Sequence, residues 1–387
     1  MSKLSGVLDV AIIGGGPAGT VAAIEARRRG LRVAIWEKTR FPRDKVCGEF
    51  ISAEVLPFLQ SVIPGVVSRG FAIRRAEFIP SAGTVRGFDF TRSALGLSRR
   101  ALDAALWQAA IEAGAEAREE QSVTELRRTP GAGQDTDIWE IKSATGETRQ
   151  AKALIIACGR WWNIDGFHSP TRQENRAGER WLGVKAHFAG VTPRGCVEMY
   201  LFKEGYCGLA PVEDGSYNLC CLLREECARE AGGRDLRNAN AWPKNIFGHP
   251  ALEARLREAQ QLAAAVTTFP VFLARRSAAQ NGALLAGDAS GFLDPFTGEG
   301  ISMALHSGRL AADAVAKRLC EGWKFERTAE LYTQHLSQAV RGSYKFATAI
   351  RNLLGAHRYV QSLAGALLPC FGRSLLNGTR WRESTGA

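Results

Sequence analysis

Hydrophobic and polar positions near the start of the chain predict two short strands with a helix between them. Residues 8–13 form an apolar, β-branched run, residues 17–29 carry small apolar side chains at helical spacing, and residues 31–37 form a second apolar run. This order predicts a β-α-β unit with parallel strands. Gly30 follows the helical pattern directly and is expected to end the helix.

Hydrophobic patterns in later segments predict further strands and a helix. Residues 74–90 and 181–223 alternate apolar and polar positions between Gly, Asp-Gly and Pro turns, which predicts antiparallel strands. Residues 151–160 form another buried strand that ends in glycine, and a helix is expected from about Gly300. The pattern predicts an α/β fold in which an antiparallel sheet is inserted twice into a Rossmann-type domain, with helices at the C-terminus.

The turn after the first strand has the chemistry of a nucleotide site. It carries glycines in the spacing G-x-G-x-x-G, and a glutamate ends the second strand. Such glycines allow a tight turn, let the backbone approach a pyrophosphate and let the helix pack on the strand. The helix N-terminus attracts the phosphates, and a carboxylate at strand end accepts the ribose hydroxyls, which favours FAD or NAD over NADP. The predicted contacts of this unit are Gly14, Gly16, Pro17, Ala18, Gly19 and Glu37.

A second glycine-rich segment, "GDASGFLDPFTGEGISMAL" (287–305), precedes a predicted helix. It resembles the second flavin signature of the para-hydroxybenzoate hydroxylase-like flavoproteins, a GD motif followed by DPxxGxGI. The resemblance implies FAD, with Asp288 at the ribityl chain and backbone near the flavin pyrimidine edge. A helix N-terminus at that edge stabilises negative charge on reduced flavin. The contacts implied there are Pro295, Gly298, Gly300 and Ile301.

Two more segments match the same family in order. Arg99 opens an amphipathic helix within residues 97–117, with Asp103 one turn later, and Val123 begins the strand that follows. The resemblance implies that the arginine helps to anchor FAD and that the backbone of Val123 meets the adenine. The matched signatures together span most of residues 1–315.

The segment "FPRDKVCGEF" (41–50) resembles the geranylgeranyl reductase-related branch, which carries K-x-C-G at this point. In that branch the cysteine lies near the flavin. The resemblance implies Cys47, Lys45 and Glu49 as catalytic candidates and Gly48 as a cofactor contact. A buried structural thiol is the alternative for Cys47, and a carboxylate at a helix N-terminus is the alternative for Glu49.

The predicted substrate pocket departs from that branch. Residues 206–211 read YCGLAP where archaeal geranylgeranyl reductases carry Y-x-W-x-F-P, so small residues replace both aromatics. A wider pocket for a different apolar or polycyclic compound is expected. Flavin halogenases carry W-x-W-x-I-P, which this sequence lacks, so halogenation is a minor alternative. The pocket candidates are Tyr206, Gly208, Ala210 and Pro211.

These features together predict an FAD-dependent oxidoreductase that acts on an apolar small molecule. The first expectation is reduction of a carbon–carbon double bond by hydride from flavin N5. The alternative is a monooxygenase in which reduced flavin carries oxygen at C4a and hydroxylates or epoxidises an aromatic, isoprenoid or polyketide-like compound. A non-catalytic flavin-binding protein is a third. Because only one G-x-G-x-x-G is present, NAD(P)H is expected to bind transiently, or a separate electron donor serves.

Composition and charge narrow the classes of protein and the location that are expected. The chain has 387 residues and a net charge of +11, yet shows no nucleic-acid signature, and its nine cysteines form no CxxC pair, which favours a reducing cytosol. No metal-ligand spacing and no apolar run of membrane-spanning length occurs. A cytoplasmic protein is expected, with peripheral contact to the inner membrane face through residues 344–376 as a further option.

The predicted domain order alternates between two units. FAD-binding segments are expected at 1–73, 96–165 and 276–325, and substrate-sheet segments at 74–95 and 166–275. A helical region is expected at 326–387.

Overall fold

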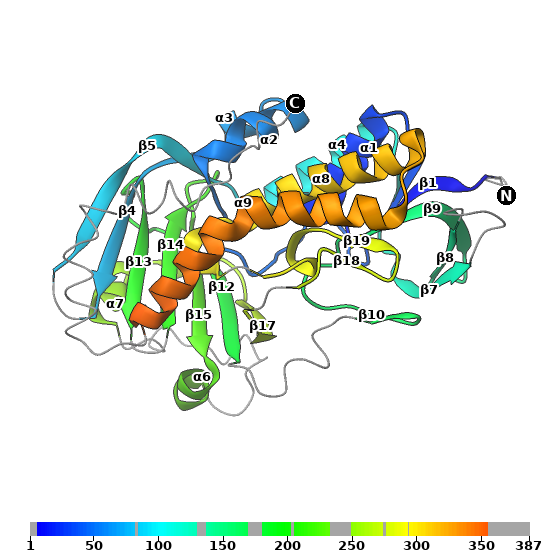
Figure 1. Cartoon of the computed structure of the whole chain (residues 1–387). Helices are drawn as coiled ribbons and strands as arrows, with labels where there is room; N and C mark the ends of the chain where they lie inside the picture. Colours follow the sequence, from blue (N-terminus) through cyan, green and yellow to red (C-terminus); the bar gives the residue numbers. More distant parts are fainter. Residues whose placement is uncertain are drawn as a thin grey trace.

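Two large sheets organise the chain, and long helices lie along one of them (Figure 1). The computed structural model describes residues 6–81, 84–129, 137–168, 180–202, 205–232, 249–273, 276–292 and 294–354. The first sheet has eight strands and the second has nine.

The first sheet holds the β-α-β unit that the sequence predicts. Strands β1 (Leu8–Ile13) and β2 (Val33–Trp36) are parallel neighbours, and α1 (Pro17–Arg28) connects them. The main order is β18-β19-β9-β1-β2-β6, with β7 and β8 joined at the side. The remaining strands of this sheet are β6 (Glu116–Arg118), β7 (Val123–Thr129), β8 (Ile138–Ser143), β9 (Thr148–Ile156), β18 (Ala279–Gln280) and β19 (Ala283–Leu285).

Small residues allow the helices beside this sheet to approach closely. A Cβ at Gly308 would lie 2.2 Å from the carbonyl oxygen of Ala18, so the backbones of α1 and α8 are in direct contact here. Figure 1 shows α1, α4 and α8 side by side, with α9 running from this group toward the second sheet. The helices of this part are α4 (Arg99–Glu112), α8 (Gly300–Glu321) and α9 (Phe325–Leu354), with shorter elements η1 (Ala53–Val55), α2 (Leu56–Val62), α3 (Val66–Arg69), η3 (Gly287–Ala289) and η4 (Pro295–Thr297).

The second sheet is built from segments far apart in the sequence. Its order is β16-β12-β15-β14-β13-β4-β5-β3, with β17 paired to β12. All its pairings are antiparallel except the parallel pair β13–β4. The strands are β3 (Phe50–Ile51), β4 (Phe71–Pro80), β5 (Arg86–Gly96), β12 (Trp181–Ala189), β13 (Cys196–Phe202), β14 (Gly205–Pro211), β15 (Tyr217–Arg224), β16 (Gln260–Gln261) and β17 (Val266–Val271).

The predicted α/β fold class is confirmed, with one mixed sheet flanked by helices and one largely antiparallel sheet. The domain boundaries stay a prediction. A separate two-stranded ribbon, β10 (Asn163–Ile164) with β11 (Phe167–His168), follows β9, and helices α6 (Glu225–Gly232) and α7 (Pro250–Leu256) belong to the second half.

The two faces of the second sheet differ. One face carries an apolar core that includes Leu182, Tyr200 and Leu209 and is covered in part by α7. On that face Cys207 and Cys221 are directly opposite across β14 and β15 and form a disulfide, whereas the sequence had favoured a reducing environment. The other face is turned toward the glycine-rich segments.

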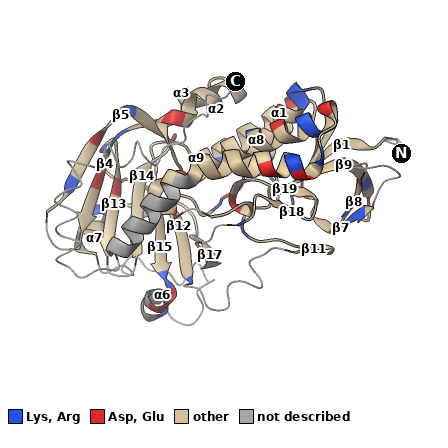
Figure 2. Ribbon diagram, viewed as in Figure 1, with Lys and Arg blue, Asp and Glu red and all other residues tan. Residues whose placement is uncertain are grey.

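Charge is spread over the molecule. Figure 2 shows Lys and Arg on α1, β5 and β8, with Asp and Glu on the same elements or beside them. In the described ranges no helix is both long enough and apolar enough to cross a membrane. The side chains of the proposed membrane-contact segment, residues 344–376, lie outside the described part of the chain.

Candidate active site

The glycines of the first turn differ in what surrounds them: two are tightly packed and one faces open space. Gly14 has φ +110°, and a Cβ there would lie 2.4 Å from the carbonyl oxygen of Ala157. A Cβ at Gly19 would lie 1.9 Å from the carbonyl oxygen of Gly14. A Cβ at Gly16, by contrast, meets nothing within 4 Å. Gly14 and Gly19 therefore permit close packing, while Gly16 presents backbone to open space at the start of α1, next to the buried Pro17 and Ala18.

Glu37 directly follows β2, and its carboxylate is buried but well hydrogen-bonded. It accepts hydrogen bonds from the Gly15 amide at 2.9 Å and from the Thr39 hydroxyl at 2.8 Å, and pairs with Arg43 at 3.1 Å. Burial alone would raise the pKa of Glu37, but Arg43 and these donors outweigh it and lower that pKa. Glu37 is thus held ionised beside the glycine turn, where the sequence predicts the ribose.

Three cations gather next to this turn. Arg99 makes a bidentate pair with buried Asp103, at 2.7 and 2.8 Å. Arg43 lies 3.8 Å from the same carboxylate, and its buried Nε has no hydrogen-bond partner among the described residues. Burial, together with the charge of Arg43, lowers the pKa of Lys45 to about 8, and within the described ranges its ammonium group has no ion pair. An anion between these groups would pair with the Lys45 ammonium group and accept a hydrogen bond from Nε of Arg43.

The second glycine segment also combines packed and open positions. Gly298 has φ +69°, and a Cβ there would lie 2.9 Å from Cδ1 of Phe50. A Cβ at Gly300, the first residue of α8, meets nothing within 4 Å, and the same holds for Gly48. Pro295 begins η4, and Ile301 is buried in α8.

Asp288 and Val123 complete the predicted cofactor contacts. Asp288 lies in η3, where its carboxylate is 32% exposed and 4.0 Å from Nε of Arg160. Val123 is the first residue of β7 and is buried.

These residues fit an FAD molecule. Open space lies over Gly16, Gly48 and Gly300, and two of these glycines stand at helix N-termini, whose free N–H groups and dipole favour an anion. The cations Arg43 and Lys45, together with Arg99, supply charge for a pyrophosphate. The unpartnered Nε of Arg43 is a donor that the protein itself does not use.

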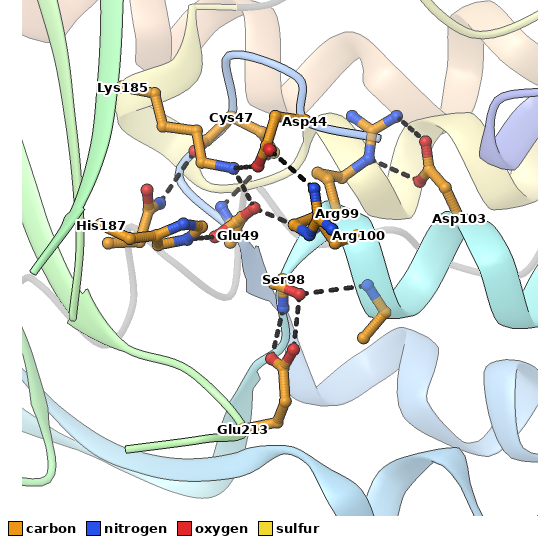
Figure 3. Close-up of polar contacts among 12 residues, drawn as sticks. Asp44, Cys47, Glu49, Ser98, Arg99, Arg100, Asp103, Lys185, His187 and Glu213 are labelled. Atoms are coloured by element: carbon orange, nitrogen blue, oxygen red, sulfur yellow. Dashed lines mark hydrogen bonds and ion pairs between the residues drawn. The ribbon is translucent and has the colours of Figure 1, made fainter. Parts of the chain in front are cut away.

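Glu49 is the centre of a buried polar cluster that joins the cofactor side to the second sheet (Figure 3). Its fully buried carboxylate accepts from Lys185 Nζ at 2.6 Å and from the backbone N–H of Arg99 at 2.7 Å. Nε2 of His187 lies 2.7 Å from the other oxygen. The residue has φ +56°, a left-handed conformation that is strained for glutamate.

The cluster extends to the surface through Asp44. Lys185 also donates to Asp44 at 3.1 Å, and Arg100 pairs with the same carboxylate at 3.1 Å. Below it, Ser98 caps α4 by accepting from the Ala101 amide.

Lys185 and His187 are functional candidates that sequence reasoning missed or treated as structural. Their only signal in the sequence is that polar side chains recur two positions apart in an apolar strand.

Cys47 lies in the loop that Glu49 anchors. Its Sγ accepts a hydrogen bond from the Glu49 amide at 3.4 Å, and its carbonyl oxygen accepts from Asn218 Nδ2 at 2.9 Å. Burial raises the pKa of Cys47, although Arg99 opposes that shift. The thiol therefore keeps its proton at neutral pH.

The predicted pocket residues lie along β14. The Tyr206 hydroxyl donates to Asp294 at 2.9 Å, which ties the strand to the second glycine segment. A Cβ at Gly208 would lie 3.4 Å from Met199 Sδ. Ala210 is buried, while the carbonyl oxygen of Pro211 fills the space where Gly96 lacks a side chain. Tyr206 and Gly208 thus face the cofactor side, and Pro211 mainly packs against β5.

Comparison with known proteins agrees with this geometry. The pyridine nucleotide-disulphide oxidoreductase family matches residues 8–179, which include the first glycine turn and Arg99. A digeranylgeranylglycerophospholipid reductase of Methanosarcina acetivorans is 25% identical over 364 residues, which cover 89% of this chain and 84% of that protein. A menaquinone reductase of Mycolicibacterium smegmatis is 27% identical over 339 residues, covering 79% of this chain and 75% of that one.

This chain is an FAD-dependent oxidoreductase. The predicted cofactor and enzyme class are confirmed. Another relative, conditioned medium factor receptor 1 of Dictyostelium discoideum, is 25% identical over 353 residues. The oxidoreductase spans only 64% of that protein's length.

Solved structures show the same fold. A flavin-dependent brominase superposes with a TM-score of 0.75 at 21% identity, covering 97% of this chain and 95% of that one. A geranylgeranyl bacteriochlorophyll reductase-like protein of Thermoplasma acidophilum gives 0.73 at 19% identity, with 96% and 95% covered. The oxidoreductase therefore shares its architecture with proteins named for different reactions, and the reaction has to be argued from its own residues.

Proposed function

We propose that this oxidoreductase reduces a carbon–carbon double bond of an apolar small molecule. The observation that carries the proposal is the Cys47–Gly48–Glu49 segment. A protonated thiol stands beside an open glycine, and the segment is held against the second sheet by a buried carboxylate. Reduction of a double bond needs one hydride and one proton at fixed positions. FAD, when bound and reduced, supplies the hydride from N5.

The residues near the first glycine turn hold and orient the cofactor in this proposal. Glu37 binds the adenosine ribose, while Arg43, Arg99 and the N-terminus of α1 bind the pyrophosphate. The surroundings of Lys45 are Arg43, Glu37, Arg99 and Lys38. We therefore assign Lys45 to the pyrophosphate and not to proton transfer.

Cys47 is the proton donor in this proposal. Its pKa is raised by burial, so the group is neutral and carries a transferable proton at pH 7. The Glu49 amide and the Asn218 side chain fix the thiol and its backbone in place. A nicotinamide donor that binds transiently, or a separate electron donor, reduces the flavin.

A monooxygenase is the second candidate, and a specific observation favours it. Apolar side chains from β13 and β14 cluster with Phe292 and Phe296, which flank Asp294 in the second glycine segment. Exclusion of water by such a cluster is what oxygen transfer from reduced flavin requires.

Stopped-flow mixing separates the two candidates. The FAD-loaded protein is reduced anaerobically and mixed with oxygenated buffer while visible absorbance is followed. Slow, direct return to oxidised flavin supports the reductase, and a transient species before reoxidation supports the monooxygenase. Cys47→Ala is then compared with Cys196→Ala, a buried thiol on β13. The reductase proposal requires that only Cys47→Ala slows reduction of an accepted substrate while FAD content is unchanged.

A further inference from the structure

We propose that a continuous chain of aromatic rings beside the second glycine segment binds a planar aromatic part of the substrate. The inference rests on the proposed function, which leaves the class of apolar substrate open.

The chain begins at β3 and continues onto β5. The rings of Phe50 and Phe90 are 5.9 Å apart, at an interplanar angle of 64°. Those of Phe90 and Phe88 follow at 5.7 Å and 69°. Both contacts have the edge-to-face geometry that aromatic pairs prefer.

It then crosses to β4 and returns to the cofactor side. Phe88 and Phe78 are 6.0 Å apart, and Phe78 lies 6.0 Å from Phe296. Phe296 meets Tyr206 at 5.1 Å and 88°. Six rings from five separate elements therefore form one connected series.

Both ends of the series reach the same loop. Phe50 packs on Gly298, since a Cβ there would lie 2.9 Å from its ring, and Phe296 precedes that glycine by two positions. The loop between them leads to Gly300, where space is open. The series therefore borders the part of the sheet nearest to the predicted flavin edge.

A row of cross-strand neighbours crosses the sheet inside this border. Phe78, Met199 and Gly208 are direct cross-strand neighbours on β4, β13 and β14. Phe78, Met199 and Phe296 are only partly buried, so part of each side chain is exposed. Gly208 adds no side chain to this row, and Met199 Sδ would lie 3.4 Å from a Cβ at that position.

The chemistry of this border selects flat ligands. Phenyl rings offer ring faces and edges but no hydrogen bonds, and the Tyr206 hydroxyl is engaged by Asp294. A planar ring system stacks on such rings without freezing rotors. A prenyl chain of equal size loses the entropy of several rotatable bonds. We therefore assign a planar, polycyclic aromatic compound with a conjugated double bond as the substrate class.

Calorimetric titration of the FAD-loaded protein tests this assignment with two probes, 2-naphthol and geraniol. These alcohols have the same number of carbon atoms and one hydroxyl each, but only one is planar and aromatic. We expect 2-naphthol to bind about tenfold more tightly than geraniol. Equal affinities, tighter geraniol binding or no binding of 2-naphthol would overturn the inference.

Matched variants locate the site. Phe78→Leu keeps the apolar character and removes one ring of the series, and it should weaken 2-naphthol binding about tenfold and geraniol binding little. Phe58→Leu is the control, because Phe58 is also partly buried but stacks on His306, outside the series. An equal loss of 2-naphthol affinity in Phe78→Leu and Phe58→Leu would contradict binding at the aromatic series. Phe296→Leu replaces Phe78→Leu if the latter lowers FAD content.

The outcomes separate this inference from the proposed function. Failure to reduce any double bond would sink the proposed reaction but leave the probe preference intact. A protein that reduces a prenyl compound and binds 2-naphthol no better than geraniol would keep the reaction and lose the substrate class.

Discussion

The carboxylate of Glu49 and the ammonium group of Lys185 are both buried, and 2.6 Å separates Oε1 from Nζ. The two residues belong to different halves of the molecule, the loop beside the cofactor and strand β12. This ion pair ties the second sheet to the loop that carries Cys47 and Gly48.

Removal of one partner of this pair should be strongly destabilising. Lys185→Met leaves the carboxylate of Glu49 buried without its cation, and we expect unfolding free energy to fall by about 3–5 kcal/mol. Urea denaturation of the FAD-free protein measures the change. The double variant Glu49→Gln with Lys185→Met should recover part of it, because no uncompensated charge remains.

Arg75→Gln is the control for that series. Arg75 pairs with Glu77 and Asp89 but its side chain is 41% exposed. The loss should stay below about 1 kcal/mol. If Lys185→Met were no more destabilising than Arg75→Gln, the buried pair would not join the two halves as described.

FAD affinity should depend on pH through Lys45. The pKa of Lys45 is lowered to about 8, so its ammonium form is present below that pH and lost above it. A bound pyrophosphate favours the ammonium form. The Kd for FAD should therefore be flat below pH 8 and rise by up to about tenfold per pH unit above it.

Fluorescence titration with FAD from pH 6.5 to 9.5 measures this dependence. Lys45→Met should weaken binding at pH 7 and abolish the change near pH 8. Lys317→Met removes an exposed lysine near the end of α8 and should keep the wild-type profile. A wild-type Kd that stays flat through this range would refute the assignment of Lys45 to the pyrophosphate.

Glycine substitutions should divide into two groups. Gly48→Ala and Gly300→Ala place a methyl group in open space, so the FAD-free protein should keep its stability within about 0.5 kcal/mol. Both should weaken FAD binding by about tenfold or more, because the methyl group occupies the cofactor's space.

Gly19→Ala should instead lower stability by about 1–3 kcal/mol, since its Cβ overlaps the carbonyl oxygen of Gly14. Thermal melting with and without FAD distinguishes the groups, and unchanged FAD affinity in Gly48→Ala would argue against the placement of the flavin.

Thiol labelling should report the state of Cys47. Burial raises its pKa, so iodoacetamide at pH 8 should modify Cys47 about tenfold more slowly than exposed Cys320. Peptide mapping by mass spectrometry follows both sites in one sample, and Cys320→Ser verifies the assignment. Labelling of Cys47 at the rate of Cys320 would show a thiolate and remove its role as proton donor.

Local patterns explain what the sequence could predict. The unit β1-α1-β2 and its glycines depend on contacts among residues close in the chain, and spacing alone identifies them. The FAD site follows from two such local units, each with its own glycine loop and helix N-terminus.

The sequence could not predict contacts that depend on strand pairing between distant parts of the chain. Lys185 and His187 meet Glu49 across 136 and 138 residues, and only the placement of β12 in the second sheet brings them there. The resemblance to the geranylgeranyl reductase-related branch groups Lys45 with Cys47. In the structure the charges that act most strongly on Lys45 are those of Arg43 and Glu37, beside the first glycine turn. The aromatic series likewise draws on elements between residues 50 and 296, whose proximity no short motif encodes.

The parallel pair β4–β13 has a consequence for how the chain is made. Strand β4 (residues 71–80) pairs early with β5, but its second neighbour, β13, is available only when residues 196–202 have been synthesised. Until then β4 and β5 form a ribbon with an open edge, a template for pairing with other chains. Distant pairings of this kind slow folding, so the newly made protein is most prone to aggregate before β13 closes that edge.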